Sequence, residues 1–259
     1  MSKTLFNRII FGPVNSRRLG KSLGINLLPD TVKLCSMDCI YCECGWGDVE
    51  GMQHSKLLSA DEIIPVLTER FKQMHDNNAQ IDSITYSGNG EPTLHPQFAE
   101  ITQAIIKLRD LYFPKTIITC LSNSTQLHRS DVLETLKSID NPLMKLDAGT
   151  QSMFELLNKP FSDLQLDDIC ENLRRFEGKL SIQTLFLRGK LDDNTVIDNT
   201  LPNEVDAWLK RLMYIRPQKV ILYPIDRETP VKLLEKIDKN TLAKIALKVQ
   251  EIGIETESY

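Results

Sequence analysis

Short apolar segments alternate with longer helical patterns over almost the whole chain. The strand-like segments lie at 24–28, 83–87, 116–121, 143–147, 181–187 and 219–223. Apolar residues recur at helical spacing over 59–75, 97–109, 131–139, 151–158, 166–176, 202–214 and 240–252. Strands that alternate with helices run parallel and are joined by right-handed crossovers. The pattern therefore predicts an α/β fold, either an open doubly wound sheet or a barrel, and we favour a partial (β/α)6 TIM-like barrel with parallel strands.

Nothing in the sequence divides the chain into separate units. It shows no internal repeat, no low-complexity tract and no linker rich in Pro, Gly or Ser. A length of 259 residues suits one large α/β domain better than two small ones. We expect a single domain over 1–259, with an N-terminal arm at 1–23 and a C-terminal helical extension at 231–259.

Charge is distributed unevenly, although the net charge is only −4. Residues 1–33 contain six Lys and Arg residues and one Asp, whereas residues 191–209 contain five acidic residues and no basic one. Three interpretations are open. The two segments are solvated faces, they pair with each other, or the basic segment forms a rim that receives an anionic substrate. The mild net acidity does not favour a nucleic-acid partner, although that alternative stays open.

The sequence lacks the usual features of a membrane or secreted protein. No apolar stretch reaches the roughly 18–20 residues that a membrane-spanning helix needs. The first residues lack the apolar region and cleavage site of a signal peptide. We therefore expect a cytoplasmic protein with no membrane partner, in which structural disulfides are not expected.

Four of the six cysteines lie within ten residues: Cys35, Cys39, Cys42 and Cys44. The first three have the spacing C-x3-C-x2-C, and three thiolates at this spacing can hold three irons of a cubane cluster and leave the fourth open. Cys44 leaves two alternatives, because it could complete a four-ligand zinc site or cap a four-cysteine cluster. Its spacing from Cys42 is tighter than a zinc knuckle, so we favour three ligands. The remaining two cysteines are predicted to be core residues: Cys120 and Cys170.

The segment Cys35-x3-Cys39-x-Tyr41-Cys42 has an aromatic residue before the last cysteine. It resembles the hallmark motif of the radical S-adenosylmethionine (SAM) superfamily. Residues 11–29, FGPVNSRRLGKSLGINLLP, and the later Asp-Arg pair at 226–227 resemble the small iron–sulfur oxidoreductases classed near the wyosine-type tRNA-modifying enzymes. The resemblance implies a [4Fe–4S] cluster on the three cysteines, SAM as a second cofactor, and a one-electron reductant such as flavodoxin or ferredoxin.

Polar residues follow the predicted strands, at the edge where barrels and α/β sheets place their sites. Ser-Gly-Asn-Gly-Glu at 87–91 resembles the Gly-Gly-Glu motif of the superfamily, with Asn89 in place of the first glycine. Gly90 would let the backbone approach a ligand closely, and Glu91 would accept hydrogen bonds from the ammonium group of SAM. The resemblance implies cofactor contacts for a wider set: Tyr41, Ser122, Asn123, Lys145, Asp147, Gln183 and Tyr223.

Two assignments in this set have alternatives. Lys145 and Asp147 lie on one face of a predicted strand, so they either contact the SAM carboxylate or pair with each other. Arg227 follows the last predicted strand and is the candidate for contacting the substrate.

Together these features predict a radical SAM enzyme. It would reductively cleave SAM to methionine and a 5′-deoxyadenosyl radical, which abstracts hydrogen from a substrate that the sequence does not identify. The alternatives are a glycyl-radical-enzyme activase, a wyosine-type tRNA-modifying enzyme and, without catalysis, a zinc or iron–sulfur binding module. Full wyosine-forming enzymes carry further cysteine ligands or a flavodoxin-like domain, and the sequence shows neither.

Overall fold

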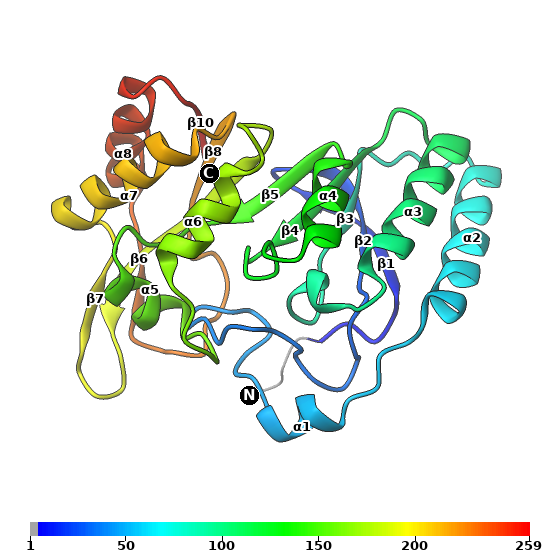
Figure 1. The fold of residues 1–259 in the computed structure, drawn as a ribbon, viewed down its shortest axis with the longest axis horizontal. Helices are drawn as coiled ribbons and strands as arrows, with labels where there is room; N and C mark the ends of the chain where they lie inside the picture. Colours follow the sequence, from blue (N-terminus) through cyan, green and yellow to red (C-terminus); the bar gives the residue numbers. More distant parts are fainter. Residues whose placement is uncertain (1–4) are drawn as a thin grey trace.

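The computed structural model describes residues 5–259 and contains one open, mostly parallel sheet (Figure 1). Its main path is, in order, β1 (Ile10–Ser16), β2 (Gly20–Ile25), β3 (Ser83–Tyr86), β4 (Ile117–Ser122), β5 (Asn141–Lys145), β6 (Ser181–Lys190), β8 (Lys219–Pro224) and β10 (Glu255–Ser258). All neighbours from β2 to β10 are parallel, and β1 is antiparallel to β2. The described edge strands β1 and β10 do not pair with each other. The predicted partial barrel with parallel strands is confirmed.

Helices connect the successive parallel strands. They are α1 (Val49–His54), α2 (Ala60–Asp76), α3 (Phe98–Tyr112), α4 (Ser130–Lys137), α5 (Gln151–Asn158), α6 (Leu166–Arg174), α7 (Pro202–Ile215) and α8 (Lys239–Glu251), with a 3-10 turn η1 at Pro92–Leu94. Helix α2 packs against α3, α3 against α4, α6 against α7, and α7 against α8, as Figure 1 shows. In the described part of the chain, no helix has the length and apolar character to cross a membrane.

The two ends of the sheet differ from the sequence-based expectation. The first parallel strand is Gly20–Ile25 rather than 24–28, because the preceding arm folds back as β1 and pairs with it. Residues 1–4 of the expected arm lie outside the described residues. The C-terminal extension contains the expected helix α8, but it then adds β10 as a seventh parallel strand beside β8. Lys219 on β8 pairs with Glu255 at 2.8 Å and with Glu257 at 2.7 Å.

Two short strands extend the barrel on one side. β7 (Val196–Asp198) and β9 (Leu234–Lys236) both pair antiparallel with the second half of β6. They lie beyond the carboxyl end of the neighbouring strand β5, so this part of β6 projects past the main sheet.

Buried aromatic packing fixes the helices to the strands that carry site residues. Trp208 on α7 is 1% exposed and packs edge-on against Phe186 of β6, with ring centroids 5.3 Å apart. Its indole Nε1 donates to Leu146 O at 3.0 Å. Helix α7 is thereby tied to the carboxyl ends of β5 and β6. The connections that follow β5 and β6 lie in the lower part of the view in Figure 1, as does the cysteine segment, which follows β2.

The acidic segment at 191–209 is not a single solvated face. Glu204 is 3% exposed, and its carboxylate accepts hydrogen bonds from Thr150 N at 3.0 Å, Thr150 Oγ1 at 2.8 Å, and Gly149 N. Asp206, two residues along α7, pairs with Lys248 at 3.0 Å. The interpretation as a solvated face is wrong for Glu204, because the turn before α5 needs its carboxylate as an acceptor. No ion pair joins the described residues of the acidic segment to those of the basic segment.

We expect Glu204→Ala to lower the free energy of unfolding by about 2–4 kcal/mol, because it leaves buried N–H donors of the turn without an acceptor. The matched control is Asp206→Ala on the same helix, which removes an exposed ion pair and should change stability by less than about 1 kcal/mol. Urea unfolding of both variants measures the difference. Equal losses for the two variants would contradict the buried-acceptor role of Glu204.

Candidate active site

Backbone hydrogen bonds hold the cysteine segment on two sides. Leu34 N donates to Asn89 O at 2.8 Å, and Glu91 N donates to Leu34 O at 2.9 Å, which joins the segment to the turn after β3. On the other side, Ile40 N donates to Leu157 O of α5 at 3.0 Å. The cysteines are thus fixed between β3 and α5, at the carboxyl edge of the sheet.

The turn after β3 is shaped to receive this segment. Gly90 has φ +137°, and a Cβ atom there would lie 1.8 Å from Leu34 O. Glycine is therefore required by the backbone of the cysteine segment, whereas the sequence suggested a ligand as the close neighbour. Asn89, which stands in place of the first motif glycine, is 0% exposed. Its amide donates to Phe6 O at 2.8 Å and to Pro29 O at 2.7 Å, so it joins the N-terminal arm to the loop after β2.

The three predicted cluster ligands are free thiols, and two of them meet predicted cofactor residues. Cys35 Sγ lies 3.5 Å from Asn123 Nδ2, and Cys39 Sγ lies 3.6 Å from Lys145 Nζ. Cys42 follows closely, since its backbone N donates to Cys39 O at 3.0 Å. The structure therefore brings these cysteines together with residues from the ends of β4 and β5.

A buried cation faces the cysteine segment. Lys33 is 1% exposed and pairs with Asp38 at 2.8 Å. Burial alone would lower the pKa of Lys33, but the charge of Cys42 and the bond to Asp38 outweigh it and raise that pKa. Hydrogen bonding to Cys44 lowers the pKa of Cys42, burial opposes this shift and the charge of Lys33 adds to it, whereas burial raises the pKa of Cys35 to about 12.

The donor set suits an iron–sulfur cluster. Thiolates are the usual ligands of such clusters, and a neighbouring cation favours the thiolate form. Cys44 directs its thiol to Gly88 O, 3.3 Å away. Within residues 5–259, no three His, Cys, Asp or Glu side chains are placed to hold a single metal ion. The three free thiols and the buried Lys33 ammonium beside them are the kinds of group that such a cluster requires.

Glu91 connects the turn after β3 to the end of β4. It is 2% exposed, and Oε1 accepts hydrogen bonds from Ser122 Oγ at 2.8 Å and from Thr93 N at 3.2 Å. Oε2 accepts from Asn123 N at 2.6 Å. Burial raises the pKa of Glu91, and these hydrogen bonds oppose that shift. Three of the predicted SAM contacts thus form one buried group.

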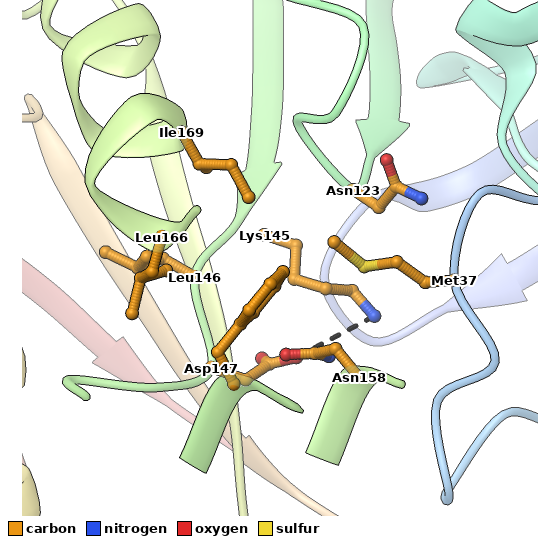
Figure 2. Close-up of a pocket in the computed structure, with 9 residues that line it drawn as sticks. Met37, Asn123, Lys145, Leu146, Asp147, Asn158, Leu166 and Ile169 are labelled. Carbon is orange, nitrogen blue, oxygen red and sulfur yellow. Dashed lines mark hydrogen bonds and ion pairs between the residues drawn. The ribbon is translucent and has the colours of Figure 1, made fainter. Parts of the chain in front are cut away.

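A second buried group lies at the end of β5. Lys145 Nζ lies 2.9 Å from Tyr41 Oη and 3.7 Å from the Asp147 carboxylate, to which Tyr41 also donates. Asn158 donates to the same carboxylate at 3.1 Å. Figure 2 shows Lys145, Asp147 and Asn158 converging beside a cavity of about 10 Å³, which is close to the space of one water molecule. Burial alone would lower the pKa of Lys145, but the charges of Cys39, Tyr41 and Asp147 raise it well above its ordinary value.

Arg18 reaches from the β1–β2 turn to the other side of the sheet. Its Nη1 donates to Gln183 Oε1 at 3.2 Å, and its guanidinium carbon lies 4.6 Å from the ring centroid of Tyr223. The adjacent Arg17 pairs with Asp226 at 2.6 Å, but Arg18 forms no ion pair with a carboxylate of the described residues. The predicted residues Gln183 and Tyr223 are therefore brought together by a cation that sequence analysis did not assign to the site.

Arg227 lies apart from the other predicted site residues. Its side chain is 70% exposed and pairs with Glu43 at 2.6 Å. Since Glu43 follows Cys42 directly, the pair links the loop after β8 to the cysteine segment. Among the described residues, the ion pair and hydrogen bond of Arg227 are both with Glu43.

Sequence reasoning missed two residues of the site, Lys33 and Asn158, and it considered Arg18 only as part of a basic segment that could form a rim for an anionic substrate. The position of Lys33 two residues before Cys35 was a usable signal. Asn158 ends a correctly predicted helix, and nothing in its local sequence marks it as buried.

Comparison with known proteins agrees with this arrangement. The family model described as the radical SAM superfamily matches residues 31–196, which is more than half of the chain. The chain therefore belongs to the radical SAM superfamily, and it is an enzyme. Within that class it belongs with the UPF0026 proteins: one from Methanocaldococcus jannaschii is 37% identical over 261 residues, covering 90% of this chain and 76% of its own length.

Solved structures show the same fold at low sequence identity. A radical SAM methyltransferase from Sphaerobacter thermophilus superposes with a TM-score of 0.63 at 13% identity, covering 92% of this chain and 65% of that one. An archaeal TYW1 superposes with a TM-score of 0.50 at 13% identity, covering 89% and 71%. At such identities the similarity concerns the fold alone.

We expect Gly90→Ala to destabilise the protein by at least about 3 kcal/mol, because both the backbone conformation and the contact with Leu34 are lost. Gly253→Ala is the matched control. Gly253 also has a positive φ, of +80°, but a Cβ there meets nothing within 4 Å, so the loss should be only about 1–2 kcal/mol. Thermal unfolding of the two variants tests this, and similar losses would show that backbone strain alone explains both.

Proposed function

We propose that this enzyme reductively cleaves SAM on a [4Fe–4S] cluster held by Cys35, Cys39 and Cys42. The observation that carries the proposal is the convergence of these thiols with two buried polar groups, one around Glu91 and one around Lys145. When bound, the reduced cluster supplies the electron that splits SAM into methionine and a 5′-deoxyadenosyl radical. The chain itself positions the cofactors and limits access of water to them.

The two buried groups offer complementary charges for the methionyl part of SAM. Among the described residues, Glu91 Oε2 accepts one hydrogen bond, from Asn123 N, so it keeps a lone pair for the ammonium group. The Lys145 ammonium is suited to the carboxylate. Ser122 and Asn123 belong to the same buried group as Glu91, and we propose that they bind the ribose hydroxyls of SAM. Gly90 sets the backbone path next to Glu91.

Remaining contacts fall on the other side of the cysteines. Tyr41 and Asp147 hold Lys145 in place. Gln183 and Tyr223 both contact the guanidinium group of Arg18. We assign Tyr223 to the adenine side and Gln183 to the methionyl side or the substrate. A flavodoxin or ferredoxin is the proposed electron donor.

For the substrate, we propose an anionic group that binds Arg18. Gln183, which holds Arg18, lies directly opposite Lys145 in the register between β5 and β6. Arg18 therefore lies beside the proposed cofactor site, with guanidinium donors that no carboxylate of the described chain occupies. Arg227 is a second candidate, although it is exposed and paired with Glu43. A protein backbone, as for a glycyl-radical-enzyme activase, and a wyosine-type tRNA base are the alternative substrates.

Replacing Cys35, Cys39 or Cys42 by Ala should abolish binding of iron after anaerobic reconstitution, because each removes one thiolate ligand. Cys44→Ala and the buried Cys120→Ala serve as controls and should keep the iron content of the parent protein. With dithionite, the parent protein should form 5′-deoxyadenosine and methionine from SAM. Severe loss of iron in Cys44→Ala, or stoichiometric zinc in place of iron, would contradict the three-ligand proposal.

A second experiment addresses the substrate. Incubation with small molecules extracted from cells that contain the protein should increase 5′-deoxyadenosine formation, and the active fraction should bind an anion exchanger. Arg18→Gln should reduce this stimulation at least about tenfold through lost charge-assisted hydrogen bonds, and Arg17→Gln should leave it almost unchanged. If Arg227→Ala loses the stimulation and Arg18→Gln keeps it, Arg227 is the substrate residue. Activity in the unbound, neutral fraction would exclude an anionic substrate.

A further inference from the structure

The buried sulfur of Cys39 lies against two nitrogen donors. Asn158 Nδ2 lies 3.4 Å from Cys39 Sγ, and Lys145 Nζ lies 3.6 Å from it. Cys35 meets a single side-chain donor among the described residues, Asn123 Nδ2 at 3.5 Å. Among the three predicted ligands, Cys39 is thus the one whose sulfur meets two side-chain nitrogen donors in the described part of the chain.

Both donors are held where they are by other buried groups. Asn158 is 1% exposed, and its amide also lies 3.1 Å from Asp147 Oδ2 and 3.3 Å from Tyr41 Oη. Lys145 contacts the same two side chains. Asp147 is itself fixed, because its Oδ1 accepts a hydrogen bond from Leu185 N at 2.9 Å. The donors cannot turn away from the sulfur without breaking this network.

The charges in the network separate the roles of the two donors. Lys145 and Asp147 carry opposite charges 3.7 Å apart, so together they add little net charge near Cys39. Asn158 is neutral and acts on the sulfur through its N–H group alone. An ammonium group has three donors, so Lys145 can bind Cys39, Tyr41 and a carboxylate of SAM together.

We infer that Asn158, together with Lys145, sets the reduction potential of the cluster by donating N–H···S hydrogen bonds to Cys39. The inference rests on the proposed function, since it needs the cluster on that sulfur. A hydrogen bond to a ligating sulfur stabilises the more negatively charged, reduced cluster and so raises its potential. Asn158 is a positioning residue, because it acts on the ligand sulfur and is not assigned to SAM or the substrate.

The test is a redox titration of the reconstituted protein without SAM. The electron paramagnetic resonance signal of the reduced cluster is measured at each potential. Asn158→Leu replaces the amide with an apolar group of similar size. At a fixed applied potential, the ratio of reduced to oxidised cluster should be about tenfold lower in this variant than in the parent protein. This corresponds to a reduction potential that is lower by about 59 mV for a one-electron couple. Iron per chain should not change. Asn172→Leu on α6 is the control, because the amide of this half-buried asparagine bonds to Asp168 O and Arg175 and to no cysteine of the segment, and it should match the parent protein.

Two further outcomes decide the inference. An unchanged potential in Asn158→Leu with full iron content would overturn it. If the leucine variant does not fold, Asn158→Ala removes the same donor without added bulk and should show the same direction of shift. Loss of the cluster in both folded variants would mean that Asn158 only holds the cysteine segment, which also overturns the inference. Failure of the parent protein to bind a [4Fe–4S] cluster would instead remove the proposed function itself.

Discussion

Two backbone hydrogen bonds between Leu34 and the turn after β3 determine where the chemistry of this protein is placed. They attach the cysteine segment to this turn by an isolated parallel bridge between Leu34 and Gly90, at a position where a Cβ atom would collide with Leu34 O. Because Glu91 follows Gly90 directly, the same contact puts its carboxylate beside Cys35. Cysteine spacing alone brings three thiols near one another. The backbone contact adds a buried carboxylate beside them.

Around the cysteines, buried charge is arranged in compensated pairs. Lys33 is paired with Asp38, and Lys145 with Asp147, so neither ammonium is left without a counter-charge in the interior. A buried ion pair contributes little net stability, because desolvation offsets much of the attraction. Its effect on the neighbouring thiols is electrostatic, because the charge of Lys33 helps to lower the pKa of Cys42.

Local pattern predicted the repeated strand–helix order and the polar residues that follow the strands at one edge of the sheet. Those features depend on contacts between neighbours in sequence or on the geometry of parallel strands. The pairing of β10 with β8, the contact of Arg18 with Gln183 and the acceptor role of Glu204 link residues that are 36 to 165 positions apart. No local pattern specifies such contacts. Asn158 shows this clearly, since its helix was predicted correctly and its contact with Cys39 was not.

The inner face of the sheet explains how an open barrel can serve such a site. Thr85, Thr119 and Asn141 face one another in register across β3, β4 and β5, and Asn141 donates to Thr119 at 3.2 Å. Side chains alternate along a strand, so Lys145 lies on the same face as Asn141, and Gln183 lies opposite Lys145. Closed barrels fill this space with layers of branched apolar side chains. Here hydroxyl and amide groups share that face with apolar residues such as Leu121 and Leu143, so the proposed anionic substrate of Arg18 would meet a surface with both kinds of contact.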